Sequence, residues 1–179
     1  MNTKLVLLPI ILAFTLTACD TYTSLQYQST PQNTIALQNL ASTGASATVG
    51  DVRLAEGIVA RPTCRLAGPL DLGGGDNLAE TIKQALQAEL LAGGMYQTGQ
   101  TPINITVTEL EPDSFSGSWN IGLQAFTQSN SGFSIESATS FSTSFSAYSA
   151  CQNTATAFNR ALADAIYRLV TDDRFASLI

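Results

Sequence analysis

The Ser-rich segment from residue 133 to residue 146 restricts the possible folds more than any other part of the chain, because its apolar and polar residues alternate. Large apolar side chains stand at odd positions and polar ones at even positions, namely Phe133, Ile135, Phe141 and Phe145 against Ser134, Glu136, Ser140, Ser142, Ser144 and Ser146. A period of two is typical of a β-strand with one buried and one wet face. The segment therefore predicts an antiparallel sheet that packs on a core through one face.

Two earlier segments share this alternation. Apolar residues occupy every second position of the segments 103–107 and 119–125. Turn-forming residues separate the three runs, with Pro112 after the first and the stretch 129–132 after the second. One further strand, or two short ones, is expected within residues 49–59, where apolar residues recur.

Two other segments have the spacing of amphipathic helices. The first begins at Asn77, which matches a capping box together with Glu80, and ends before a Gly-Gly pair. The second covers residues 151–170, where apolar side chains fall on one helical face. The order strand–helix–strand–strand–strand–helix predicts an α+β fold. We expect a four-stranded, mostly antiparallel sheet with two helices packed on one face.

The N-terminal residues follow a different pattern. Lys4 precedes an apolar run from Leu5 to Leu16, which is shorter than the roughly 20 residues of a membrane-spanning helix and suits a signal peptide. The run ends in Leu16-Thr17-Ala18-Cys19, which resembles the lipobox of bacterial lipoproteins. The resemblance implies that the Cys19 thiol carries a diacylglycerol, that cleavage follows Ala18, and that the new amine is acylated, commonly with palmitate.

This resemblance also implies a location. Two or more acyl chains give stable membrane attachment, so we expect a protein anchored on the periplasmic side of a bacterial membrane through Cys19. Asp20 resembles the residue that retains enterobacterial lipoproteins in the inner membrane, which favours that membrane, and the outer membrane is the alternative.

The predicted organisation has three parts: a signal peptide (1–18), a lipidated N-terminus with a flexible tether (19–45), and one α+β domain (46–179). Residues 21–50 carry no charge and are rich in Ser, Thr, Gln and Asn, which is typical of a linker. The apolar residues among them either rest on the domain or belong to a segment that becomes ordered on a partner.

With the lipobox in front, this order of elements resembles three groups of small periplasmic lipoproteins. These are the YajG-like lipoproteins, the lipopolysaccharide-assembly auxiliary lipoprotein and the auxiliary lipoproteins of ABC transport systems. The resemblance covers about residues 46–179 and implies an accessory role in the cell envelope, although a shared fold alone does not confer a function.

Composition excludes several classes of function. The chain of 179 residues has no histidine, eight basic and 14 acidic residues, and a net charge of −6. The scattered basic residues form no stripe for phosphates, so we expect no nucleic-acid partner. Without histidine, the chain cannot supply a Ser-His-Asp or Cys-His catalytic unit or an imidazole metal ligand. We expect no catalytic residues, no metal and no cofactor.

Cys64 and Cys151 remain after lipidation of Cys19. In an oxidising periplasm two thiols in one domain most often pair, so we predict a disulfide between them. On the chain-entropy estimate, closing the loop from Cys64 to Cys151 contributes about 4.6 kcal/mol to the free energy of unfolding. The alternatives are two separate thiols or a redox pair, but the CxxC spacing typical of redox motifs is lacking.

Two other clusters could carry chemistry. Gly73-Gly74-Gly75 precedes a predicted helix, but no Gly-Lys-Ser/Thr follows and Asp76 places a negative charge where a phosphate would bind. We interpret it as a flexible loop before the helix. The carboxylates of Glu109, Glu111 and Asp113 could bind Ca²⁺ or supply a glycosidase-like acid and base, or they form a solvated strand end.

These observations favour a non-enzymatic, lipid-anchored accessory protein that binds a protein partner, or an envelope lipid or glycan. The alternative is a hydrolase of envelope polymers that uses the Glu109–Asp113 carboxylates. If residues 133–146 lie at a sheet edge, then Ser140, Ser142 and Ser144 mark an interaction edge without Lys or Pro to block it. A partner strand or a second copy of the chain would cover such an edge by β-augmentation.

The lipobox generates a first prediction. A Cys19→Ala variant should stay uncleaved by the lipoprotein peptidase and carry no acyl chains, because the acceptor thiol is absent. Intact-mass analysis of detergent-extracted protein measures both properties. A wild-type protein that is processed normally but carries no acyl chain would contradict the lipoprotein assignment.

Overall fold

The computed structural model describes residues 21–179, which form three helices and two β-sheets. In chain order the elements are β1 (Tyr22–Thr23), α1 (Pro31–Ala41), β2 (Thr48–Leu54), β3 (Thr63–Cys64), β4 (Gly68–Asp71), α2 (Leu78–Ala92), β5 (Pro102–Asp113), β6 (Ser118–Phe126), β7 (Phe133–Ser140) and α3 (Ala147–Val170). The predicted signal peptide (1–18), Cys19 and Asp20 lie outside the described residues. Among the helices of residues 21–179, none is long and apolar enough to cross a membrane.

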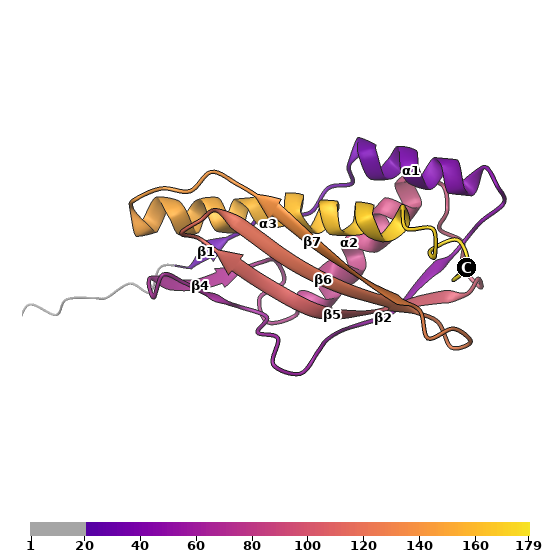
Figure 1. Cartoon of the computed structure of the whole chain (residues 1–179), viewed down its shortest axis with the longest axis horizontal. Helices are drawn as coiled ribbons and strands as arrows, with labels where there is room; N and C mark the ends of the chain where they lie inside the picture. Colours follow the sequence, from indigo (N-terminus) through magenta and orange to yellow (C-terminus); the bar gives the residue numbers. More distant parts are fainter. Residues whose placement is uncertain (1–20) are drawn as a thin grey trace, which may run out of the picture.

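The larger sheet has four strands in the order β2-β5-β6-β7 (Figure 1). β6 pairs antiparallel with both β5 and β7, but β2 pairs in parallel with β5. The sheet is therefore mixed, and the expectation of a mostly antiparallel sheet is corrected. The reason lies in the connection between β2 and β5. It passes through α2, and a crossover of this kind joins parallel strands.

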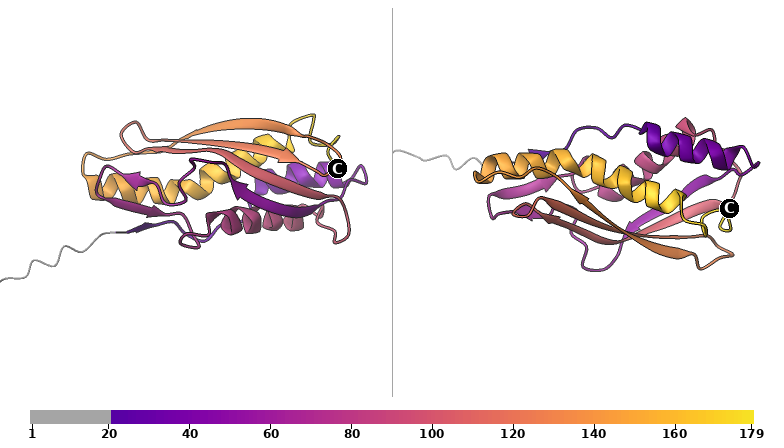
Figure 2. Two further views of the ribbon diagram at one scale, coloured as in Figure 1. Left: turned by 90° about the horizontal axis from the view of Figure 1, so that it is seen from below. Right: turned by 45° about the horizontal axis from the view of Figure 1, so that its top comes forward.

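The core lies between this sheet and the two longer helices. α2 lies against β2, while α3 crosses β6 and β7, and α1 packs on α2 and α3 (Figure 2). Trp119 of β6 and Phe158 of α3 are fully buried, with ring centroids 5.5 Å apart. The Trp119 indole donates a hydrogen bond of 2.9 Å to the Thr154 carbonyl. The alternation of β6 thus faces its apolar side chains toward α3.

The smaller sheet has the order β1-β4-β3 and lies at the end of the molecule where α3 begins (Figure 1). A disulfide joins Cys64 of β3 to Cys151 of α3, with the two Cα atoms 5.7 Å apart. The predicted pairing is confirmed. The disulfide fastens the β3–β4 hairpin to the first turns of α3.

Residues 21–45 differ from the flexible tether that the sequence predicts. Tyr22 belongs to β1, which pairs with β4, and residues 31–41 form α1. Thr30 caps this helix and Pro31 occupies its first turn, both favoured choices for a helix start. Tyr22 and Leu37 are buried in the main core, so their apolar side chains hold the segment on the domain.

One buried carboxylate organises this segment. Glu89 of α2 has no exposed surface, and its Oε1 accepts hydrogen bonds from the Tyr27 hydroxyl (2.6 Å), the Thr30 amide (3.0 Å) and Asn33 Nδ2 (3.0 Å). Asn33 Nδ2 also donates to the Ala163 carbonyl of α3 at 3.1 Å. Burial, and then the Glu89 carboxylate, raise the pKa of Tyr27 far above its usual range. The phenol therefore stays protonated and remains a donor.

β7 is shorter than the sequence predicts. It ends at Ser140, whereas the alternation continues to residue 146. Ser142 and Ser144 lie in the loop before α3, so they are not part of the strand edge predicted for them. Phe145, which the alternation places on the buried face, is fully exposed, with a relative accessibility of 107%.

A local competitor ends the alternating pattern. The Ser146 hydroxyl accepts a hydrogen bond of 3.1 Å from the Ser149 amide and caps α3. Serine favours such caps over strand interiors, because its hydroxyl bonds to nearby amides. α3 therefore begins at Ala147, before the start expected at residue 151.

The hydrogen bonds to Glu89 predict that this residue contributes to the free energy of unfolding. Glu89→Ala should lower the free energy of unfolding by about 3 kcal/mol, because the Thr30 and Asn33 donors lose their buried acceptor. It should also expose residues 27–41 to limited proteolysis. Urea denaturation and protease mapping measure the two effects.

Glu80→Ala is the matched control, because Glu80 lies on the same helix but is exposed and bonds only to Gln84 among the described residues. We expect a loss of less than about 0.5 kcal/mol there. Equal losses for the two variants would contradict the role assigned to Glu89.

Candidate functional site

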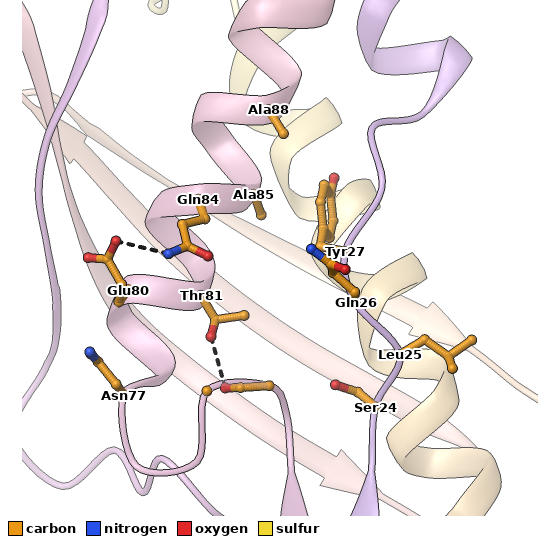
Figure 3. A pocket seen from close by; sticks show the side chains of 12 residues that line it. Ser24, Leu25, Gln26, Tyr27, Asn77, Glu80, Thr81, Gln84, Ala85 and Ala88 are labelled. Atoms are coloured by element: carbon orange, nitrogen blue, oxygen red, sulfur yellow. Dashed lines mark hydrogen bonds between the residues drawn. The ribbon is translucent and has the colours of Figure 1, made fainter.

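A cleft of about 490 Å³ lies between the segment before α1 and residues 80–88 of α2 (Figure 3). Glu80 is the only formally charged side chain among its lining residues, which are Ser24, Leu25, Gln26, Tyr27, Gly73, Gly74, Asn77, Glu80, Thr81, Gln84, Ala85 and Ala88. The cleft is thus lined by amide and hydroxyl groups together with the small side chains of Ala85 and Ala88. It has neither a cysteine nor a histidine to act as nucleophile or base.

The glycine turn borders this cleft and explains why it is no phosphate loop. Gly73, Gly74 and Gly75 all have positive φ angles (98°, 73° and 63°), which glycine adopts without strain. The amides of Gly73 and Gly75 donate to Asp71 Oδ1 at 3.1 and 3.3 Å. The protein's own carboxylate therefore occupies the donors that an anion would need.

The start of α2 differs in detail from the predicted capping box. The Asn77 side chain makes no capping hydrogen bond, and Glu80 instead accepts one from Gln84 at 3.2 Å (Figure 3). The turn before the helix is closed by Thr81, whose hydroxyl donates to the Gly73 carbonyl at 2.8 Å. These contacts position the wall of the cleft.

The three carboxylates of β5 have different environments. Asp113 closes the β5–β6 turn: its Oδ1 accepts from the amides of Phe115 (2.8 Å) and Ser116 (3.0 Å), and its Oδ2 accepts from the Ser116 hydroxyl (2.7 Å). These hydrogen bonds, led by those from Ser116, lower the pKa of Asp113 below its usual range. Asp113 is therefore a turn-forming residue.

Glu109 stands on the outer face of the sheet. It pairs with Gly122 of β6, which pairs with Glu136 of β7, so two carboxylates flank a position without a side chain. Partial burial, then the charges of Glu111 and Glu136, raise the pKa of Glu109. No group of three or more His, Cys, Asp or Glu residues within residues 21–179 is placed to hold a metal ion. A hydrolase built on these residues stays an untested alternative.

The edge of β7 is the remaining site predicted from the sequence. β7 is the last strand of the four-stranded sheet, and Ser140 is its final residue. Arg160 of α3 donates a hydrogen bond to the Ser140 carbonyl. The exposed positions of this strand are the even ones, Ser134, Glu136, Ala138 and Ser140. The predicted edge therefore exists over residues 133–140, without Ser142 and Ser144.

Sequence reasoning missed Arg65, which connects loops far apart in the chain. Its guanidinium donates to the Ser114 carbonyl at 2.5 Å and to the Ser144 carbonyl at 2.9 Å. Nothing in the local sequence marks this residue, because its partners lie 49 and 79 positions away. The available sequence signal was Phe115, because a large apolar residue is unusual in a turn made of Ser and Gly.

Comparison with known proteins adds information on the fold. No family model matches the chain, and no curated protein matches it. The crystal structure of protein XCC0632 from Xanthomonas campestris, assigned to the family DUF330, is similar, with a TM-score of 0.52 and 12% sequence identity. The match covers 88% of this chain and 96% of that chain. At this identity the likeness concerns the fold alone.

The Asp113 turn predicts a pH dependence. Because the folded-state pKa of Asp113 is lowered, its stabilisation of the turn is complete at neutral pH. It is lost in acid, as the pH falls below the ordinary range of an aspartate and through the lowered folded-state pKa. Hydrogen exchange at the Phe115 and Ser116 amides should therefore accelerate in acid, relative to the intrinsic rate.

Asp113→Asn should remove this acid transition while keeping the turn, because the Asn oxygen accepts the same amides at every pH. Asp51→Asn, at an exposed position of β2, is the control and should leave the transition unchanged. A transition that persists in Asp113→Asn would assign it to another group.

Proposed function

We propose that the protein is a non-enzymatic accessory lipoprotein of the bacterial cell envelope. It is anchored through Cys19 on the periplasmic side of a membrane and binds a strand of a protein partner along β7. The anchor is supported by Leu16-Thr17-Ala18-Cys19 and the preceding apolar run. Asp20 favours the inner membrane, with the outer membrane as the alternative.

The edge of β7, which has few protecting residues, is the observation that carries the binding proposal. β7 has eight residues and contains neither Lys, Arg nor Pro. Natural sheets protect their free edges with such residues, with bulges or with covering segments. The opposite edge strand, β2, has more of this protection: it carries Asp51 and Arg53, and its pairing with β5 is shifted between Val49 and Val52, whereas β7 carries Glu136 alone.

The proposed occupant is a strand from a different protein. Two copies of β7 paired antiparallel about the middle of the strand would bring their Glu136 side chains close together, and like charges across strands are destabilising. The acidic chain, with a net charge of −6, adds repulsion between copies. A partner strand with a basic residue opposite Glu136 meets neither obstacle.

Lysine substitutions along β7 test this proposal. In cells that produce the full chain, crosslinking should capture a partner. Ser134→Lys combined with Ala138→Lys should abolish that complex, because edge lysines oppose strand addition. The melting temperature should change little, since both positions are exposed.

Ser142→Lys is the matched control, because Ser142 is exposed but lies beyond the end of β7. It adds the same charge nearby and should leave the complex intact. A complex that survives the β7 substitutions, or one that is equally lost in Ser142→Lys, would overturn the β7 proposal.

A further inference from the structure

The three most exposed large apolar side chains of residues 21–179 gather at one end of the molecule. They are Phe145, Leu66 and Phe115, with relative accessibilities of 107%, 97% and 73%. Leu66 lies in the β3–β4 turn, Phe115 in the β5–β6 turn and Phe145 in the loop between β7 and α3. Figures 1 and 2 show these three connections together at the end where β1 begins. We call this surface the apolar tip.

We infer that the apolar tip inserts into the surface of the lipid bilayer that holds the Cys19 anchor. The inference rests on the anchor of the proposed function. It adds which end of the domain contacts the membrane, and through which side chains.

Polar contacts inside the protein build the tip. The Arg65 guanidinium donates to the carbonyls of Ser114 and Ser144 and to the Thr143 hydroxyl at 3.2 Å. The Thr143 hydroxyl in turn donates to the Ser114 carbonyl. The loops that carry Phe115 and Phe145 are therefore joined through one cation. The exposed Phe115 and Phe145 side chains are thus carried by loops that these hydrogen bonds hold together.

The Arg65 side chain packs on the Phe115 ring, and the Leu66 and Phe115 side chains beside it stay exposed. Its guanidinium carbon lies 4.5 Å from the centroid of the Phe115 ring, and its positive φ of 47°, followed by 57° at Leu66, directs the backbone through a tight turn. Phenylalanine and leucine supply apolar area for the acyl boundary. The N–H groups of Arg65 bond to protein acceptors, and its positive charge makes this end less strongly repelled by anionic headgroups than the acidic remainder of the chain. This combination suits the interfacial layer of a bilayer.

Chain length places the anchor beside the tip. Tyr22 pairs with Leu70 in the small sheet, and its ring lies 5.8 Å from that of Tyr148 at the start of α3. Cys19 precedes Tyr22 by three residues, which span at most about 11 Å when extended. α3 runs from this end over 24 residues, or about 36 Å. The anchor can therefore reach the membrane only near the tip end of the domain.

The acidic character of the rest of the chain is consistent with an end-on orientation. A net charge of −6 disfavours a domain that lies flat on anionic headgroups. Contact through a small tip that includes Arg65 avoids this repulsion. The β7 edge then extends away from the bilayer and remains open to a periplasmic partner.

Photocrosslinking in living cells tests the inference. The photoreactive residue benzoylphenylalanine replaces Phe115 or Phe145 in the full chain, in cells grown with radioactive phosphate. The control probe replaces Ile35, an exposed apolar residue of α1 with 59% accessibility, away from the tip. After irradiation, we expect phospholipid adducts at the two tip positions to exceed the adduct at position 35 at least tenfold.

Two results would overturn the tip assignment. One is a phospholipid yield at positions 115 and 145 no greater than at position 35. The other is crosslinking of both tip probes to a protein, or to a second copy of the chain, in place of lipid. Either would show that the tip is covered by something other than the bilayer.

Intact-mass measurement of the same samples separates this inference from the proposed anchor. Acylated protein without lipid adducts at the tip would overturn the tip assignment and leave the anchor standing. Protein without acyl chains would overturn the anchor, and with it the membrane orientation. The result for the β7 lysine variants affects neither the tip assignment nor the anchor.

Discussion

The contact between α3 and the inner face of β6 and β7 is the interaction on which the rest of the structure depends. Trp119 and Phe158 fill its centre, and the Trp119 indole bonds to the Thr154 carbonyl of the helix. α2 covers β2 next to α3, and α1 rests on both helices. The disulfide to Cys151 brings the small sheet to the beginning of α3. α1, α2 and the small sheet are thus positioned relative to α3, which packs on the alternating strands β6 and β7.

A buried carboxylate without a described cation partner extends this arrangement to the N-terminal segment. Glu89 accepts three hydrogen bonds from residues 27–33 through Oε1, and these bonds join the N-terminal segment to α2. The ordering of this segment has a consequence for the proposed anchor. A flexible tether over residues 19–45 would let the domain move freely below the membrane. With β1 starting at Tyr22, three residues remain, and the domain's orientation becomes restricted.

The candidate sites separate into groups that the protein uses internally and groups that it leaves available. Asp71 and Asp113 bind backbone amides of neighbouring turns, which removes them from chemistry with a ligand. Arg65 is engaged by carbonyls, yet its fixed loops leave Phe115 and Phe145 in solvent. Side chains contact β7 at both ends: Arg160 bonds to the Ser140 carbonyl, and the Arg174 guanidinium carbon lies 4.6 Å from the Phe133 ring centroid. The Phe115 and Phe145 side chains and the exposed positions of β7 are thus left at the surface.

The sequence by itself determined the elements whose pattern is local. Periodicity and composition encode the alternation of residues 103–107 and 119–125, the apolar face of α3 and the pairing of Cys64 with Cys151, so all of these could be read from the sequence. The end of β7 has a local cause, because the Ser146 hydroxyl caps α3. Tertiary structure alone decided the parallel pairing of β2 and the docking of residues 21–45. Both depend on partners distant in the chain: Arg53 of β2 lies 53 positions from Thr106, and Glu89 lies 56 positions from Asn33. A local pattern cannot register such partners, because hydrogen bonds between segments exist only after the chain has brought them together.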